Sequence, residues 1–284
     1  MSSYYEFQLP EKILSGDGAL EHVPHELTLL GAGRPLLLSD RGLEKVGTVD
    51  TVTAALAQGG MTPAKVYCDI PADSSIQVVN TIAALYRESG CDSLIAVGGG
   101  SVIDTAKGVG MVLAQAGSDL MASAGAEVLP RGAHVPFVAV PTTSGTGSEA
   151  TIVAVVKDPE AQVKMEFLSY HLLPDVAVLD PRMTETLPPR ITASTGFDAL
   201  VHAIEAATCL QRNPVSDSFA ERPSASSAGT SRPPWSTAGT VGPGWPWPTA
   251  ASWQGPPSPT PWWVWSTPSA TPWGASAGCP TGRP

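Results

Sequence analysis

Residues 92–107 read Asp-Ser-Leu-Ile-Ala-Val-Gly-Gly-Gly-Ser-Val-Ile-Asp-Thr-Ala-Lys, and this stretch decides the fold. A run of strand-forming apolar residues leads into three consecutive glycines, after which apolar residues recur every three or four positions. The pattern predicts a strand, a glycine turn and a helix. Glycines allow positive φ and close backbone approach, and the first turn of a helix favours a bound phosphate. Two interpretations stay open: a phosphate-binding loop, or a tight turn without a ligand.

The stretch does not have the G-x-G-x-x-G spacing, so the ordinary dinucleotide fingerprint is not present. On both sides of it, short apolar strands alternate with helical patterns. The expected strands are 7–14 (an edge strand or hairpin), 35–39, 65–70, 94–97, 136–140, 151–156 and 176–179, and the expected helices are 20–30, 43–58, 76–85 and 102–115. This alternation predicts an α/β fold built from βαβ units around a mainly parallel sheet.

In such sheets the ligand lies beyond the carboxyl ends of the strands, where the strand order reverses. Asp40, the run Gly98–Ser101 and the run Thr142–Ser148 each follow a predicted strand directly. We therefore expect all three to line one edge of one crevice, where a dinucleotide is the predicted ligand. The strand pattern stops after Pro181, and a helix over 192–208, capped by Thr192 or Ser194, predicts a second, helical region.

Composition divides the chain near residue 220. All eight tryptophans lie after residue 230, and residues 221–284 contain no Leu, Ile, Met, Phe, Tyr, His, Lys, Asn or Asp. A segment rich in Pro, Trp, Ser and Gly cannot form helices or a regular apolar face, so we expect it to be disordered. Our hypothesis is that this tail is a frame-shifted translation. A native low-complexity tail is the alternative.

Charge and cysteine content limit the class of protein. The net charge of −10 argues against a nucleic-acid or acidic-membrane partner. No apolar run reaches the roughly 18–20 residues of a membrane span, and the first residues do not resemble a signal peptide. The four cysteines are scattered, which fits neither a disulfide framework nor a zinc knuckle. A reducing, cytoplasmic location is therefore expected.

Three groups of residues carry candidate chemistry. A carboxylate at Asp40 can accept both ribose hydroxyls and repel a 2′-phosphate, which favours NAD over NADP, although an aspartate here can also be a helix cap. The hydroxyl-rich loop 142–148 offers donors to phosphates or a nicotinamide amide, or is an ordinary Ser/Gly loop. Asp198 and His202 are four apart on the predicted helix and can hold a divalent metal, or form a structural pair.

Together these segments resemble the iron-containing (group III) alcohol dehydrogenases, over residues 7–220. The matching motifs are GGGSVIDTAK (98–107), PTTSGTGSE (141–149), LPDVAVLDP (173–181) and TGFDALVHAIE (195–205). The resemblance implies a nucleotide-binding α/β domain over 1–185 and the first part of a helical, metal-binding domain over 186–220, before the tail at 221–284. It implies that cofactor contacts come from Asp40, Gly98, Gly99, Gly100, Ser101, Asp104, Thr142, Thr143, Ser144, Thr146 and Lys164.

The same resemblance makes Asp198 and His202 the first two ligands of iron, or of another divalent metal such as zinc, and implies no catalytic residue beyond this metal site. The family's other two ligands are histidines further along, and residues 203–284 contain no histidine. We therefore expect weakened metal binding. The expected function is an impaired NAD- and metal-dependent alcohol dehydrogenase acting on a small alcohol or aldehyde. The alternatives are a catalytically silent nucleotide-binding fragment and a glycerol dehydrogenase-like enzyme. The family forms homo-oligomers, which the interrupted helical region calls into question here.

Overall fold

The computed structural model describes residues 10–117, 119–123, 133–210 and 213–217. The chain divides into two compact units, which we describe separately. The first contains Pro10–Thr143 and Ser148–Thr186, and the second contains Ser144–Gly147 and the residues from Leu187 onward. The predicted tail at 221–284 and residues 7–9 of the first predicted strand lie outside the described residues.

Six parallel strands form the sheet of the first unit, in the order β1-β8-β5-β4-β2-β3. Their bounds are β1 Lys12–Ser15, β2 Pro35–Leu38, β3 Lys65–Tyr67, β4 Ser93–Gly98, β5 Phe137–Pro141 and β8 Val176–Leu179. The predicted α/β fold with a mainly parallel sheet is confirmed. From β2 the chain builds β3 on one side, then returns past β2 to build β4, β5 and β8 on the other. The strand order therefore reverses between β2 and β4.

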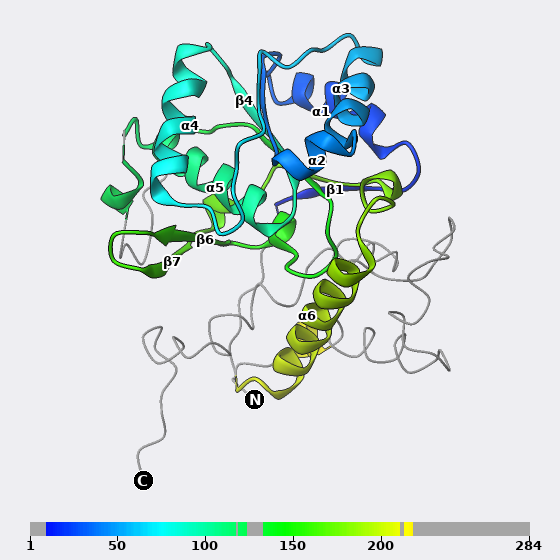
Figure 1. The fold of residues 1–284 in the computed structure, drawn as a ribbon, viewed down its shortest axis with the longest axis vertical. Helices are drawn as coiled ribbons and strands as arrows, with labels where there is room; N and C mark the ends of the chain where they lie inside the picture. The colour runs from blue at the N-terminus through cyan, green and yellow to red at the C-terminus, as the bar shows by residue number, and fades with distance from the viewer. Residues whose placement is uncertain (1–9, 118, 124–132, 211–212, 218–284) are drawn as a thin grey trace. The chain divides into compact units, whose positions relative to one another are not determined.

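Helices cover both faces of this sheet, as Figure 1 shows for the first unit. The helices of this unit are α1 Val23–Leu29, α2 Arg41–Lys45, α3 Thr48–Gln58, α4 Ile76–Glu88 and α5 Gly100–Ala114, with 3-10 turns η1 Ala19–His22, η2 Leu120–Ser123, η3 Ser148–Ala150, η4 Tyr170–Leu172 and η5 Pro181–Met183. Side chains of one strand alternate between the two faces. Leu36 and Leu38 pack in the core with α4 and α5, and Leu37 packs in the core with α1 and α3. Burial on both faces explains why the strands read as continuous apolar runs.

Only one strand of the second, two-stranded sheet was predicted from the sequence. β6 Val153–Asp158 matches the strand expected at 151–156, but it pairs antiparallel with β7 Val163–Leu168 and does not join the parallel sheet. The strand β7 was not predicted from the sequence. Its residues Val-Lys-Met-Glu-Phe-Leu mix charged and apolar side chains because only Phe167 is buried, so the strand gives a weak sequence signal.

The single helix predicted at 43–58 is wrong. Two helices, α2 and α3, occupy this stretch, and Gly47 separates them with φ of 82°. This left-handed conformation is accessible to glycine at little cost and breaks the helical hydrogen bonds. The strand expected over 65–70 ends at Tyr67, and α5 begins at Gly100, two residues before the predicted start.

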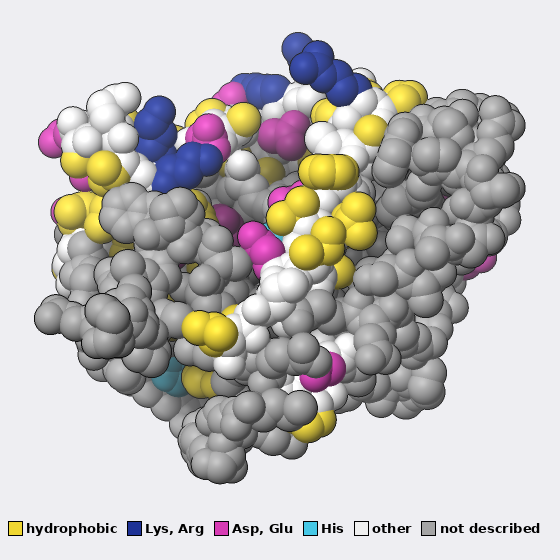
Figure 2. Space-filling view, turned by 90° about the horizontal axis from the view of Figure 1, so that it is seen from below, with side chains coloured by type: hydrophobic (Ala, Val, Ile, Leu, Met, Phe, Trp, Pro, Cys, Tyr) yellow, Lys and Arg dark blue, Asp and Glu magenta, His cyan; other side chains and the backbone are white. Residues whose placement is uncertain are grey.

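In the second unit, α6 Pro189–Thr208 matches the predicted helix but begins three residues earlier, with a proline in its first turn. The predicted caps are wrong because both lie inside the helix, where Thr192 Oγ1 donates to the carbonyl of Pro188 and Ser194 Oγ to that of Ile191. α6 exposes Phe197 and Ile204 by more than half of their surface. Figure 2 shows hydrophobic and acidic side chains of the described residues both reaching the surface on one face. Among the described residues, no helix combines the length and apolarity needed to cross a bilayer.

Candidate functional site

The carboxyl edge of the parallel sheet gathers most of the predicted cofactor residues. β4 pairs with β2 on one side and with β5 on the other, so the residues that follow these strands are neighbours. Asp40 follows β2, Gly98–Ser101 follow or end β4, and Thr142 and Thr143 follow β5. The N–H of Thr142 donates to the carbonyl of Gly98 at 3.1 Å, which joins two of these segments directly. Asp40 and the glycine turn flank the reversal between β2 and β4, where doubly wound sheets bind ligands, and the Thr142–Thr143 segment lies on the other side of the glycine turn.

Close packing, and not a positive φ, is the reason that this turn requires glycine residues. Gly99 precedes α5 with φ of −79°, and none of Gly98, Gly99 and Gly100 has a positive φ. A Cβ on Gly98 would lie 2.5 Å from Cγ2 of Val102, and one on Gly99 would lie 3.1 Å from Oγ1 of Thr143. No side chain caps the N-terminus of α5. The start of this helix is therefore not capped by a side chain, which is compatible with a bound phosphate.

Asp40 caps the N-terminus of α2. The sequence had left this role open as the alternative to a ribose contact. Its Oδ1 accepts from the N–H groups of Gly42, at 2.7 Å, and Leu43, at 3.0 Å. Both bonds use the same oxygen, so the second oxygen of the half-buried carboxylate is available to a ligand at this edge. The two roles are therefore compatible, and the ribose contact stays a prediction.

Asp73, a residue not predicted from the sequence, links Lys164 to the glycine turn. The Lys164 ammonium contacts Oδ1 of Asp73 at 2.7 Å, and the N–H of Asp73 donates to Oγ of Ser101 at 3.3 Å. Asp73 has φ of 54°, in the region that aspartate enters more readily than most residues. The Lys164 ammonium holds the pKa of Asp73 below its ordinary value. The positive charge thus lies beside the start of α5, where a phosphate would bind.

Asp104 faces the protein interior. Its two oxygens accept from Ser148 Oγ, at 2.5 Å, and from the N–H of Val155, at 3.1 Å. These bonds tie α5 to η3 and β6, so the geometry favours a positioning role for Asp104 behind the glycine turn.

Beside Asp104 lies a group of buried charges that the sequence did not reveal. Lys107 donates to the carbonyls of Thr151 and Val153 and to the Thr151 hydroxyl, and its burial lowers its pKa to about 8. Burial raises the pKa of Glu149 to about 7. Burial, followed by repulsion from Glu149, raises the pKa of Glu11, whose carboxylate oxygens have no hydrogen-bond partner among the described residues.

Ser144 and Thr146 belong to the second unit, whereas Thr142 and Thr143 belong to the first. Within the second unit, Gly145 packs against α6: a Cβ there would lie 2.6 Å from the carbonyl oxygen of Thr195. Only glycine fits at this position. The contacts predicted for Ser144 and Thr146 with a cofactor stay predictions.

The predicted metal ligands share one helix. Asp198 and His202 lie four residues apart on α6, as expected. Across the described ranges, no group of three or more His, Cys, Asp or Glu side chains is placed to hold a metal ion. Two ligands from one helix do not complete the three- or four-ligand sphere of a catalytic metal site. The described residues therefore do not fit a bound iron or zinc ion.

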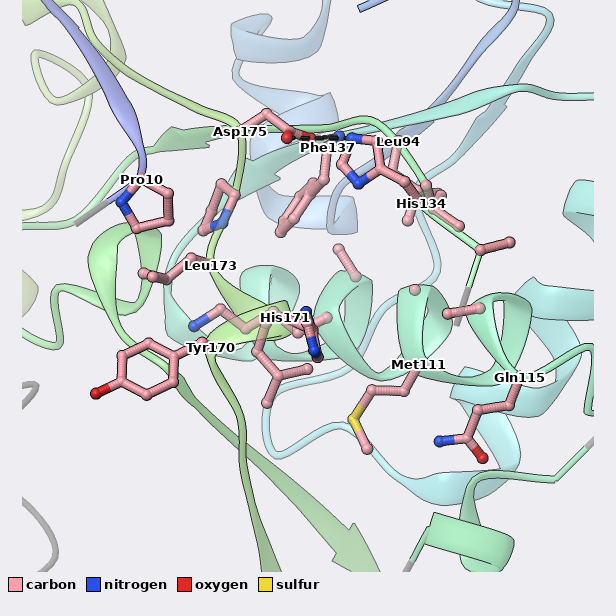
Figure 3. Close-up of a pocket in the computed structure, with 18 residues that line it drawn as sticks. Pro10, Leu94, Met111, Gln115, His134, Phe137, Tyr170, His171, Leu173 and Asp175 are labelled. Atoms are coloured by element: carbon pink, nitrogen blue, oxygen red, sulfur yellow. Dashed lines mark hydrogen bonds and ion pairs between the residues drawn. The ribbon is translucent and has the colours of Figure 1, made fainter. Parts of the chain in front are cut away.

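A cavity of about 210 Å³ lies away from the crevice, at the amino edge of the same sheet (Figure 3). It is lined by the starts of β4 and β5, at Leu94 and Phe137, and by the segment before β8. His134 and Asp175 form an ion pair at its rim, with Nε2 and Oδ1 3.2 Å apart. Since ligands of doubly wound sheets bind at the opposite edge, this cavity is not the candidate cofactor site.

Comparison with known proteins identifies related chains. The model of a family described as "Iron-containing alcohol dehydrogenase" matches residues 10–181. A choline dehydrogenase from Bacillus subtilis (strain 168) is 35% identical over 221 residues, which cover 78% of this chain and 55% of that protein. The chain spans just over half the length of this relative.

Two solved structures have the same fold. A 1,3-propanediol oxidoreductase superposes with a TM-score of 0.72 at 35% identity, over 76% of this chain and 56% of that one. A sulfoacetaldehyde reductase from Bifidobacterium kashiwanohense, in complex with NAD⁺, superposes with a TM-score of 0.71 at 28% identity, over 77% of this chain and 57% of that one. Because the family model matches residues 10–181, more than half of the sequence, the chain belongs to the iron-containing alcohol dehydrogenase family.

Proposed function

We propose that this chain binds NAD at the carboxyl edge of its parallel sheet and that its dehydrogenase activity on a small alcohol or aldehyde is impaired. One observation carries the binding proposal: Asp40, the start of α5 and the Thr142–Thr143 segment meet where the strand order reverses. The NAD⁺ complex of the related sulfoacetaldehyde reductase supports it.

The pyrophosphate and one ribose of the dinucleotide have matching groups at this edge. The uncapped start of α5 and the Lys164 ammonium favour the pyrophosphate. The second oxygen of Asp40 accepts from the ribose hydroxyls, and a carboxylate there disfavours a 2′-phosphate. Thr143, whose hydroxyl lies against Gly99, can donate to a phosphate oxygen. Bound nicotinamide would supply the hydride acceptor, and these residues would bind and orient the cofactor.

The impairment is proposed from the ligand set. In the family the metal polarises the substrate oxygen, and Asp198 and His202 provide only two of the four expected ligands. The two further histidines that the resemblance implies have no counterpart in residues 203–284. This observation favours a second candidate, a chain that binds the nucleotide without turning over substrate.

We also propose that residues after about Ala220 are a frame-shifted translation, because nearly every large aliphatic residue disappears where helical sequence should continue. Reading the gene beyond codon 220 in its other two frames tests this. The proposal predicts that one frame encodes an amphipathic helical sequence with two histidines. If neither frame does, the tail is native low-complexity sequence.

The functional test uses the full chain. We expect NADH fluorescence titration to show saturable binding. We expect NADH oxidation with a small aldehyde to stay near background whether or not iron or zinc is added. Binding with robust, metal-dependent turnover would show that the activity is intact and refute the impairment. Absence of NADH binding would refute the proposed function as a whole.

A further inference from the structure

The residue after Asp40 is an arginine held by two carboxylates. Nε and Nη2 of Arg41 contact Oδ1 and Oδ2 of Asp69 at 2.5 and 2.9 Å, and Nη1 contacts Oε2 of Glu44 at 2.8 Å. The contact with Asp69 is bidentate, which fixes the plane of the guanidinium as well as its position. All three side chains keep about half of their surface exposed.

This ionic group lies at the carboxyl edge of the sheet, on the β3 side of Asp40. Asp69 follows β3 two residues after its end, and β3 pairs with β2 with Leu38 opposite Tyr67. The N–H of Ile70 donates to the carbonyl of Ser39 at 3.4 Å, which holds the ends of the two strands together. The glycine turn lies on the other side of β2. A dinucleotide with its pyrophosphate at α5 and its ribose at Asp40 would therefore direct the 2′ oxygen toward Arg41.

The charges of Asp40, Arg41, Glu44 and Asp69 also act on one buried thiol, that of Cys68. Burial and then the charge of Glu44 raise the pKa of Cys68, and Arg41, Asp69 and Asp40 act on it as well. Because Arg41 contacts both Asp69 and Glu44 and directly follows Asp40, these four charged residues form one local cluster. Three carboxylates and one guanidinium leave this cluster with an excess of negative charge.

The chemistry of the cluster bears on the choice between NAD and NADP. An arginine near the ribose is the usual partner of a 2′-phosphate in dinucleotide sites, because its planar donors match phosphate oxygens. Here the donors of Arg41 already serve carboxylates. A 2′-phosphate would have to displace Asp69 or Glu44 and would then face two or three negative groups at short range.

We propose that Asp69 and Glu44 are specificity-determining residues, which hold Arg41 away from a 2′-phosphate and so add to the preference for NAD set by Asp40. This inference rests on the proposed binding of NAD at this edge. It assigns to Arg41 a latent capacity for a 2′-phosphate that its two partners suppress.

The test compares NADH and NADPH titrations of the full chain and of the double variant Asp69→Asn/Glu44→Gln. We expect the NADPH affinity of the variant to rise about tenfold, the scale of one hydrogen bond between charged groups, with the NADH affinity changed by less than about twofold. Adding Arg41→Met to the double variant should abolish the gain. Glu88→Gln, at the end of α4 and the opposite edge of the sheet, is the control for a general change in net charge.

The outcomes distinguish a failure of the specificity inference from a failure of the proposed NAD binding. NADH binding with no gain in NADPH affinity, or a gain that persists without Arg41, would overturn the inference and leave the proposed function standing. A gain equal to that of Glu88→Gln would also overturn it, because long-range charge would then explain the effect. A wild-type chain that does not bind NADH would overturn the proposed function and the inference with it.

Discussion

The ammonium of Lys164 lies 2.7 Å from the carboxylate of Asp73, although the two residues are 91 positions apart in the chain. The same Asp73 is bonded through its N–H to Ser101, at the start of α5. A carboxylate thus neutralises the one lysine that the family resemblance assigns to the cofactor. A phosphate at the start of α5 would compete with Asp73 for this ammonium.

Replacing Asp73 with Asn should tighten NADH binding. An exposed ion pair contributes at most about 1 kcal/mol, so we expect a gain of up to about fivefold in affinity. Fluorescence titration at low ionic strength measures it. In a Lys164→Met background the same substitution should have no effect, and a gain of equal size there would show that Asp73 acts by another route.

Replacing Gly99 with Val should weaken NADH binding while the fold is retained. The added side chain would press on Thr143, whose Oγ1 lies 3.1 Å from the position of the new Cβ. This contact would displace the glycine turn at the start of α5. Several hydrogen bonds to phosphate depend on this turn, so we expect a loss of about tenfold or more.

The matched control is Gly110→Ala in the same helix, where a Cβ meets no atom within 4 Å. Alanine there should raise stability by about 0.5–1 kcal/mol in urea denaturation and leave NADH affinity unchanged. If both glycine variants weaken NADH binding equally, the effect comes from the helix as a whole and not from the turn.

Replacing Glu149 with Gln should reduce the pH dependence of stability. The pKa of Glu149 is raised to about 7 in the folded chain, so the folded state binds its proton more tightly than the unfolded state. Its favourable contribution is complete below its unfolded pKa of about 4.5 and is lost as the pH rises through 7.

The free energy of unfolding should therefore fall between pH 5 and 8 in the wild type and fall less in the variant. We expect the variant to be more stable than the wild type at pH 8 by about 1–3 kcal/mol. Parallel pH profiles for the two proteins would show that Glu149 does not titrate in this range.

Replacing Arg182 with Met should destabilise the first unit. Burial raises the pKa of Asp180, but hydrogen bonds from Arg182 and from the N–H of Leu20 outweigh it and keep the pKa below its ordinary value. Arg182 also binds Glu21 through two bonds of 2.9 and 2.8 Å. The variant leaves the Asp180 carboxylate buried without its charged partner, and we expect a loss of about 1–3 kcal/mol at pH 7.

The pH dependence of this loss is opposite in sign to that of Glu149. A carboxylate with a lowered pKa stabilises the folded state above its unfolded pKa of about 3.9, and its contribution is lost as the pH falls. The difference between wild type and Arg182→Met in urea denaturation should therefore shrink as Asp180 is protonated. A difference that is constant down to low pH would indicate lost packing instead of a lost ion pair.

Added zinc or iron(II) should leave the melting temperature nearly unchanged. Binding to the folded state contributes at most about 0.4 kcal/mol when the ion concentration does not exceed the Kd. Two ligands on one helix should give such a weak site. A larger shift that His202→Ala abolishes would show that the metal site is more complete than the described residues indicate.

The sequence by itself determined the α/β fold, the positions of most strands and the segments that follow them. These features are local: apolar runs of the right length specify buried strands, and parallel strands place their carboxyl ends at one edge. The sequence also predicted that Asp40, the glycine turn and Thr142 would converge, because each of these segments directly follows a strand of one parallel sheet.

Tertiary structure decided the rest, because it depends on residues far apart in the chain. It divided the predicted helix 43–58 at Gly47 and placed β7 against β6 through an antiparallel pairing that weak alternation did not reveal. It also paired Arg41 with Asp69 and Lys164 with Asp73. A charged side chain chooses its partner by distance in the folded chain, and the spacing of residues along the sequence does not fix that distance.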